Sequence, residues 1–306
     1  MIVIGESIHI ISRQVRAAID NRDKAFLQDL ALRQVEGGAH WLDLNIGPQK
    51  KTGVAAMTWL VNIIQEVTDV PLVLDTTNVE AIEAGLKACN KPALINSTDA
   101  TSERLNALMP LAAEYNANII ALTLGSSGLP STVDARLALV LEQILPAAAQ
   151  YNVPFDHIFL DPLVLTVNGN QEQATQAIEA IRYFKQACEP PPMTTCGLSN
   201  ISNGAPEEMR PLINRVFLTM MLGAGLDSAI MNCLDDELTE TLHIIDPGDK
   251  STPKSRLDLS LYNSYVIGEQ FDISTVDMDN PELRDIAKTI QILQNQLLYA
   301  HSYLNT

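Results

Sequence analysis

Basic residues are scarce in this chain, and that shortage excludes two classes of partner. Only 20 Lys and Arg stand against 37 Asp and Glu in 306 residues, which gives a formal net charge of −17. A chain of this charge repels phosphate groups, so we expect it to bind neither nucleic acid nor an anionic membrane. It also has no run of about 18 apolar residues, which excludes a membrane-spanning helix.

Cysteine and histidine are also sparse, and their spacing excludes common metal and disulfide frameworks. The four cysteines form no C-x-x-C pair, and the five histidines form no i, i+4 pair. We therefore predict no structural zinc site, no disulfide scaffold and no metal. The first six residues include no basic group and no long apolar stretch, so we expect no signal peptide and a cytoplasmic location.

The chain does have short apolar runs that recur at regular intervals and read as strands. Their apolar residues are consecutive rather than alternating, which is typical of strands buried on both faces of a parallel sheet. The segments between them place apolar residues at helical spacing, as in 23–37 and 54–67. Eight runs are present, at 1–6, 41–47, 71–77, 92–98, 118–124, 157–165, 193–202 and 226–232.

Eight strand–helix units over ~250 residues predict an α/β fold, a (β/α)8 TIM barrel. A doubly wound open sheet is the alternative, but eight regular units favour closure. We expect a single domain over residues 1–306. The stretch 246–281 is rich in Pro and Gly and reads as an insertion, and a helix is predicted after it, over about 281–303.

Polar residues gather at one end of the predicted strands. Asp and Asn are depleted in strands, yet five of these strands carry one at the carboxyl end, where TIM barrels form their sites. Such a cup of carboxylates and amides suits a neutral heterocycle such as a pterin or a purine. It does not suit phosphate, because basic residues are missing there until Arg210 and Arg215. The candidates are Glu6, Asp43, Asn45, Asp75, Asn96, Asp161, Ser199 and Asn200.

Six motifs in order resemble a known family. The chain is similar to the pterin-binding barrels and most of all to the methyltetrahydrofolate:corrinoid protein methyltransferases, over roughly residues 1–240 and the last helix. This resemblance implies a homodimer of one-carbon metabolism that moves a methyl group between N5 of methyltetrahydrofolate and the cobalt of cobalamin on a partner corrinoid protein. The motifs are LDLNIGP (42–48), LDTTN (74–78), INST (95–98), DPL (161–163), GLSNIS (197–202) and RPLINR (210–215).

The resemblance also implies roles for individual residues. Asn200 is expected near N5, where it stabilises the transition state as the catalytic residue. The expected pterin-binding residues are Asp75, Asn96, Asp161, Ser199, Asn203 and Arg210, and the expected supporting residues are Glu6, Asp43 and Asn45.

The chain departs from the family at the end of the first strand. Gly5-Glu6-Ser7-Ile8-His9 stands where the family has Gly-Glu-Arg-x-Asn, so His9 is either a proton donor or plain surface. Two other functions stay open. A dihydropteroate synthase-like enzyme needs a cation for pyrophosphate around strands 7 and 8, where Ser199, Asn200 and Asn232 stand instead. A folate-binding subunit without catalytic activity would bind the folate but would not transfer a methyl group.

Overall fold

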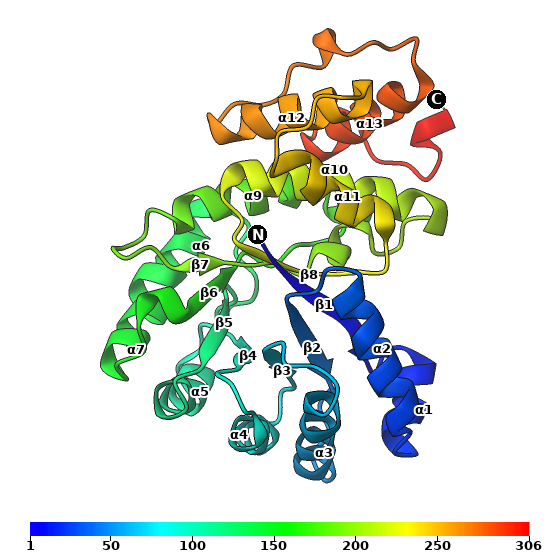
Figure 1. The fold of residues 1–306 in the computed structure, drawn as a ribbon. Coiled ribbons are helices and arrows are strands. Elements are labelled where there is room, and N and C mark those ends of the chain that lie inside the picture. Colours follow the sequence, from blue (N-terminus) through cyan, green and yellow to red (C-terminus); the bar gives the residue numbers. More distant parts are fainter. Residues whose placement is uncertain (306) are drawn as a thin grey trace.

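The computed structural model describes residues 1–305, and eight parallel strands form its centre. They are hydrogen-bonded in the order β7-β6-β5-β4-β3-β2-β1-β8, and helices lie around the outside (Figure 1). The predicted TIM barrel is thus confirmed. The strands are β1 (Ile2–His9), β2 (Trp41–Asn45), β3 (Leu72–Asp75), β4 (Leu94–Thr98), β5 (Asn118–Leu122), β6 (Ile158–Asp161), β7 (Met193–Thr194) and β8 (Ser228–Met231).

The seam between β7 and β8 is closed by a few specific contacts instead of a full ladder. One isolated parallel bridge joins Gly197 to Ile230. The Asp227 carboxylate accepts from the backbone N–H of Thr194 at 2.8 Å and from its hydroxyl at 3.0 Å. The strand predicted over 193–202 therefore pairs as a strand only at Met193–Thr194, and its second half turns into the 3-10 helix η3 (Leu198–Ser202).

Several helices begin or end at residues that cap them. The Asn78 and Thr101 side chains accept N–H groups from the first turns of α4 and α5, and α2 ends at Gly37. The short α1 was not predicted. The helices up to β8 are α1 (Arg13–Asp20), α2 (Lys24–Glu36), α3 (Gly53–Gln65), α4 (Val79–Ala88), α5 (Ser102–Glu114), α6 (Val133–Leu139), the π-helical turn η1 (Val140–Ile144), α7 (Leu145–Gln150), η2 (Phe155–His157), α8 (Val167–Asn170), α9 (Glu172–Phe184), η4 (Glu207–Met209) and α10 (Arg210–Ala224).

The segment beyond β8 adds a second helical layer. In Figure 1, α12 (Pro253–Val266) and α13 (Pro281–Leu293) lie outside α10 and α11 (Asp236–Ile245), on the side away from the strands. The predicted insertion 246–281 thus contains a capped helix as well as the short η5 (Ile273–Thr275). The predicted extension of the last helix to 303 was wrong, because α13 ends at Leu293 and Leu298 is 83% exposed.

The lumen of the barrel has an apolar level made of one residue from each of five strands. Because side chains on a strand alternate, the residue two positions later on each strand faces the same way. Those next residues are Glu6, Asp75, Asn96, Leu122 and Asp161, so a polar level follows the apolar one at the carboxyl ends. The apolar level is Ile4, Val73, Leu94, Ile120 and Phe159.

Candidate active site

The strand register brings the predicted residues of β2, β3 and β4 to the same height. Asn45 is the ladder partner of Asp75, and Asp75 is the partner of Asn96. In the ladder between β5 and β6, Leu122 lies opposite Asp161. The register of a parallel sheet, which the sequence cannot give in detail, therefore builds one polar wall over β2–β4 from neighbouring side chains that are 21 and 30 residues apart in the chain.

Hydrogen bonds connect the residues of this wall. The Asn96 amide donates to Asp43 Oδ1 at 3.2 Å, and the Asn45 amide donates to Asp75 Oδ2. Asn45 is held in turn by the backbone N–H of Gly47, 3.0 Å from its Oδ1. Each amide thus holds a carboxyl group in place, so the wall is ordered before any ligand arrives.

Burial makes two of these carboxyl groups unusually basic. Loss of solvation raises the pKa of Asp75 to about 6, although the bonds from Asn45 and Asp43 lower it. Asp43 is 3% exposed, and burial together with the charge of Asp75 raises its pKa well above the ordinary value. Two carboxylates this close do not both ionise readily, so the charge of Asp75 favours the protonated form of Asp43.

Glu6 ties the first strand to the segment after β7. The Ser199 hydroxyl lies 2.8 and 3.0 Å from the two Glu6 carboxylate oxygens. Burial raises the Glu6 pKa, and the Ser199 bond and the Arg210 charge oppose that rise. These contacts bring Glu6, Ser199 and Arg210 together across the β7–β8 seam.

Asp161 stands on the other side of the cup, held by the backbone. Its Oδ1 accepts the Leu163 N–H at 2.7 Å, and its carbonyl accepts from the Thr123 N–H at 2.9 Å and from the Thr123 hydroxyl at 3.1 Å. It is 7% exposed, and burial raises its pKa to about 7. Thr123 was not predicted, although it directly follows β5 at the same end of the barrel.

The two predicted amides after β7 lie at the open rim. Asn200 and Asn203 are both exposed, and the Asn203 amide donates to Asn200 Oδ1 at 3.2 Å. Arg210 begins α10 and donates to the Ser202 hydroxyl at 3.3 Å and to Asn203 Oδ1 at 3.4 Å. The structure therefore separates a half-buried wall over β2–β4 from a more exposed polar edge on η3 and at the start of α10.

The altered end of β1 borders a side hollow. A cavity of about 380 Å³ reaches Glu6 and is lined also by Ser7, His9 and Asn232. The Ser7 backbone N–H donates to the buried Gln34 side chain at 2.8 Å. Burial lowers the pKa of His9, so this imidazole is mostly neutral at pH 7 and is placed at the edge of the cup.

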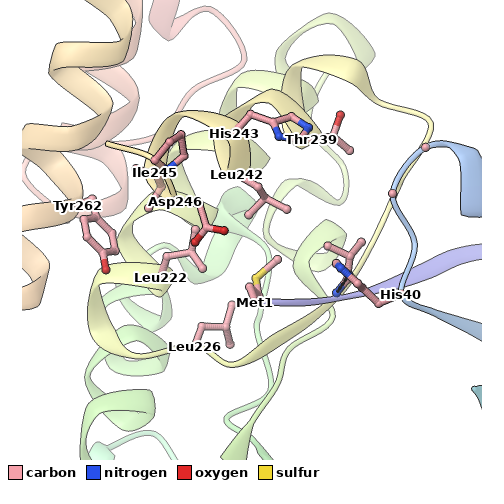
Figure 2. Close-up of a pocket in the computed structure, with 14 residues that line it drawn as sticks. Met1, His40, Leu222, Leu226, Thr239, Leu242, His243, Ile245, Asp246 and Tyr262 are labelled. Carbon is pink, nitrogen blue, oxygen red and sulfur yellow. Dashed lines mark hydrogen bonds between the residues drawn. The ribbon is translucent and has the colours of Figure 1, made fainter. Parts of the chain in front are cut away.

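A second hollow lies at the opposite end of the barrel. A cavity of about 560 Å³ lies at the amino ends of β1, β2 and β8, and Figure 2 shows the side chains that line it. Met1, His40, Leu222, Leu242, His243 and Tyr262 are among its lining residues. The predicted site residues belong to the carboxyl ends, so this hollow is separate from them.

The described residues 1–305 contain no cluster of three or more His, Cys, Asp or Glu side chains that could hold a metal ion. Over the same residues no helix is long and apolar enough to span a membrane. Cys196 and Cys233 are buried and unpaired. Burial raises both thiol pKa values, so they are poor nucleophiles.

Comparison with known proteins identifies the family of this chain. The family described as "pterin binding enzyme" matches residues 13–232, a span that runs from α1 to just past β8. The chain belongs to the pterin-binding enzymes. Its cup of carboxylates and amides therefore lies at the carboxyl ends of the strands of a pterin-binding barrel.

The relatives of this pterin-binding enzyme include methyltransferases. It is 32% identical to the methylcorrinoid:tetrahydrofolate methyltransferase of Eubacterium limosum over 237 residues, which is 76% of this chain and 85% of that protein. It is 34% identical to the methionine synthase of Mycobacterium leprae over 242 residues, again 76% of this chain but 20% of that longer protein.

Solved structures share the fold at lower identity. The dihydropteroate synthase (DHPS) of Yersinia pestis, with a pterine-sulfa conjugate, has a TM-score of 0.59 at 14% identity and covers 82% of this chain and 94% of its own. The dihydropteroate synthase of Thermus thermophilus has a TM-score of 0.55 at 18% identity, over 72% of this chain and 88% of its own. These likenesses establish the barrel architecture.

Proposed function

We propose that this pterin-binding enzyme is a methyltransferase that moves a methyl group between N5 of methyltetrahydrofolate and the cobalt of a corrinoid carried by a separate protein. The observation that supports it most is the hydrogen-bonded wall of Asn45, Asp75 and Asn96 facing Asp161 at the carboxyl end of the barrel. The identity to a methylcorrinoid:tetrahydrofolate methyltransferase over most of both chains points to the same reaction.

The cup offers the groups that a reduced pterin needs. An amino-pyrimidinone edge presents neighbouring N–H donors, and one ionised carboxylate accepts two of them. Asp75 and Asp161, with pKa values of about 6 and 7, ionise in the range where such an acceptor is useful. Asn96 offers both a donor and an acceptor for a mixed edge. In this proposal these three residues hold the ring, while Asn45 holds Asp75 and Asp43 holds Asn96.

The transfer itself needs help at N5 because a tertiary amine is a poor leaving group. The reduced cobalt of the corrinoid attacks the methyl carbon, a Co–C bond forms, and the C–N5 bond breaks with its electron pair left on N5. The charge on N5 changes in this step. A polar group that interacts with N5 more strongly in the transition state than in the ground state therefore accelerates the transfer. Asn200 fills that role in our proposal. An amide is no general acid, so the proton for N5 comes from water or from the hydrogen-bonded network.

The exposed edge has a further role in this proposal. Ser199, Asn203 and Arg210 surround Asn200 or face Glu6, and we assign them to the folate at the mouth of the cup. The corrinoid belongs to the partner protein and is a substrate here. A homodimer, which the family resemblance implies, and a cytoplasmic location complete the proposal.

The test is a calorimetric titration of the purified protein with methyltetrahydrofolate, followed by addition of chemically reduced cobalamin. We expect saturable binding and the appearance of methylcobalamin in the visible spectrum. A matched variant is Asp75→Ala, which removes an acceptor from the wall and should weaken binding. Asp69→Ala is its control, because Asp69 is exposed and precedes the same strand at the other end.

Absence of binding would overturn the proposal, because the cup would then serve another ligand. Binding without transfer, even with corrinoid proteins supplied, would leave a folate-binding subunit. Condensation of a pterin pyrophosphate with p-aminobenzoate would instead identify a dihydropteroate synthase. We do not expect this result, since Ser199, Asn200 and Asn232 stand at the strand ends where pyrophosphate needs cations.

A further inference from the structure

Arg136 of α6 is a buried cation whose hydrogen-bond partners are neutral. Its side chain is 0% exposed. Its Nε donates to the carbonyl of Pro162 at 3.0 Å, and its Nη2 donates to Gln173 Oε1 at 2.9 Å. Among the described residues, its Nη1 has no hydrogen-bond partner. Burying a charge without an opposite charge is expensive, so this position calls for a compensating role.

The Pro162 carbonyl links Arg136 to the candidate site through one peptide group. That carbonyl and the Leu163 N–H belong to the same peptide, and the Leu163 N–H donates to Asp161 Oδ1 at 2.7 Å. Leu163 has φ = +60°, a left-handed conformation that is unfavourable for a bulky L residue. The guanidinium at the carbonyl and the carboxylate at the N–H hold the two ends of this strained turn.

We propose that Arg136 is a positioning residue that fixes the Pro162–Leu163 peptide so that its N–H orients the Asp161 carboxylate and keeps it ionised for the pterin. The role of Asp161 toward a pterin rests on the proposed function. The link from Arg136 to the Asp161 carboxyl does not, because it is a property of the ligand-free protein.

The physical basis is the polarisation of a peptide by a cation. A guanidinium bonded to a carbonyl strengthens the N–H donor at the other end of that amide. A stronger bond to the charged form of a carboxyl lowers its pKa, and the Leu163 bond already opposes the rise that burial causes at Asp161. Removing the guanidinium should therefore raise the pKa of Asp161 further.

The other groups that face Asp161 do not replace this contact. From β5, Thr123 donates to the Asp161 carbonyl and leaves the carboxylate free. From the segment after β7, the buried Cys196 thiol senses the Asp161 charge, and that charge raises the pKa of Cys196. A neutral thiol supplies no cation, so the peptide at Pro162–Leu163 is the route by which positive charge acts on Asp161.

The experiment compares wild type with Arg136→Gln and Arg136→Lys in the full chain. The Asp161 carboxyl is titrated by NMR with ¹³C-labelled aspartate in ligand-free protein, and Asp161→Asn assigns its signal. Arg215→Gln is the matched control, because Arg215 is 4% exposed but contacts Glu237 of α11 outside the barrel. Methyltetrahydrofolate binding is then measured by calorimetry from pH 5.5 to 8.5.

We expect Arg136→Gln to move the Asp161 titration upward by about one pH unit. Arg136→Lys, which keeps the charge but not the forked geometry, should shift it less, and Arg215→Gln should leave it in place. The pH below which folate binding is lost should rise by the same amount as the titration. A purely structural role would lower stability in both Gln variants and leave the Asp161 titration unchanged.

An unchanged titration in Arg136→Gln would overturn the inference. If that variant does not fold, the titration is measured in the neutral variant Arg136→Met, and an unchanged value there would do the same. Failure of the wild type to bind methyltetrahydrofolate would instead count against the proposed function alone, because the NMR titration needs no ligand.

Discussion

The lumen of the barrel has two levels that differ by two residues along the same strands. The lower level, with Val73 and Phe159, is apolar and packed, and Trp41 lies 5.8 Å from the Phe159 ring. The upper level replaces these side chains with Asp75 and Asp161, whose pKa values burial raises to about 6 and 7. Burial of the apolar lower level stabilises the fold, whereas burial of the carboxyl groups in the upper level costs some of that stability.

This difference separates stability from chemistry within single strands. A carboxyl group that is buried beside another carboxyl destabilises the fold, but it presents a rigid acceptor to a ligand. The apolar level beneath it offsets that loss and fixes the strand register on which the polar wall depends. We expect substitutions in the two levels to have opposite signatures.

The largest expected effect is in the lower level. Phe159→Ala should lower the free energy of unfolding by ~3–5 kcal/mol, because it leaves a cavity in a dry part of the barrel. Urea denaturation measures this loss. Phe155→Ala is the control, since Phe155 lies before β6 on η2 and is only half-buried. Equal losses in both variants would mean that the lower level carries no special share of the stability.

The next effect is on transfer and leaves stability alone. Asn200→Ala should slow methyl transfer from bound methyltetrahydrofolate by ~100-fold, the size seen when one transition-state hydrogen bond is removed. Its side chain is exposed, so unfolding should hardly change. Single-turnover formation of methylcobalamin separates this step from binding, and the exposed Asn263 of α12 supplies the control Asn263→Ala. A loss confined to binding would show that Asn200 holds the ground state instead.

A smaller effect concerns affinity. Asp75→Ala removes an acceptor from the ring and leaves Asn45 without its partner, which should weaken folate binding by ~1–3 kcal/mol. Calorimetry measures the dissociation constant, with Asp69→Ala as the control. Unchanged affinity would show that the pterin does not lie against β3 and that the polar wall does not bind it.

The fold was readable from the sequence because its signal is repeated. Eight apolar runs and the helical spacing between them predict the barrel, whereas the caps that Asn78 and Thr101 supply became visible only in the structure. The weak points were local. The run at 193–202 is apolar enough for a strand, yet only Met193–Thr194 pairs as one, and α13 ends at Leu293, about ten residues before the predicted end at 303.

The candidate site was only partly readable. Residue types at strand ends predict Asp75, Asn96 and Asp161 as neighbours, because parallel strands share an end. The bonds between Asn45 and Asp75 and between Asn96 and Asp43 depend on register. Arg136 was not predicted, because nothing in its helix distinguishes it from a surface arginine; its burial arises from α9 and the turn at Pro162.

The smallest effect tests the upper level directly, through the pH dependence of stability. The folded-state pKa of Asp161 is raised to about 7, so the folded protein binds this proton more tightly than the unfolded chain does. Stability from this group therefore falls as the pH rises from 4 to 7.

Asp161→Asn removes the buried charge but leaves an amide N–H₂ without an acceptor, so the net gain in the free energy of unfolding should be about 1 kcal/mol at pH 7.5. The gain should shrink as the pH falls through 7, because wild type then takes up its proton. Thermal unfolding from pH 5 to 8 measures it, with the exposed Asp156→Asn as control. A gain that is the same at every pH would show that Asp161 is not the titrating group, whereas the expected slope, together with lost folate affinity, would show one residue trading stability for binding.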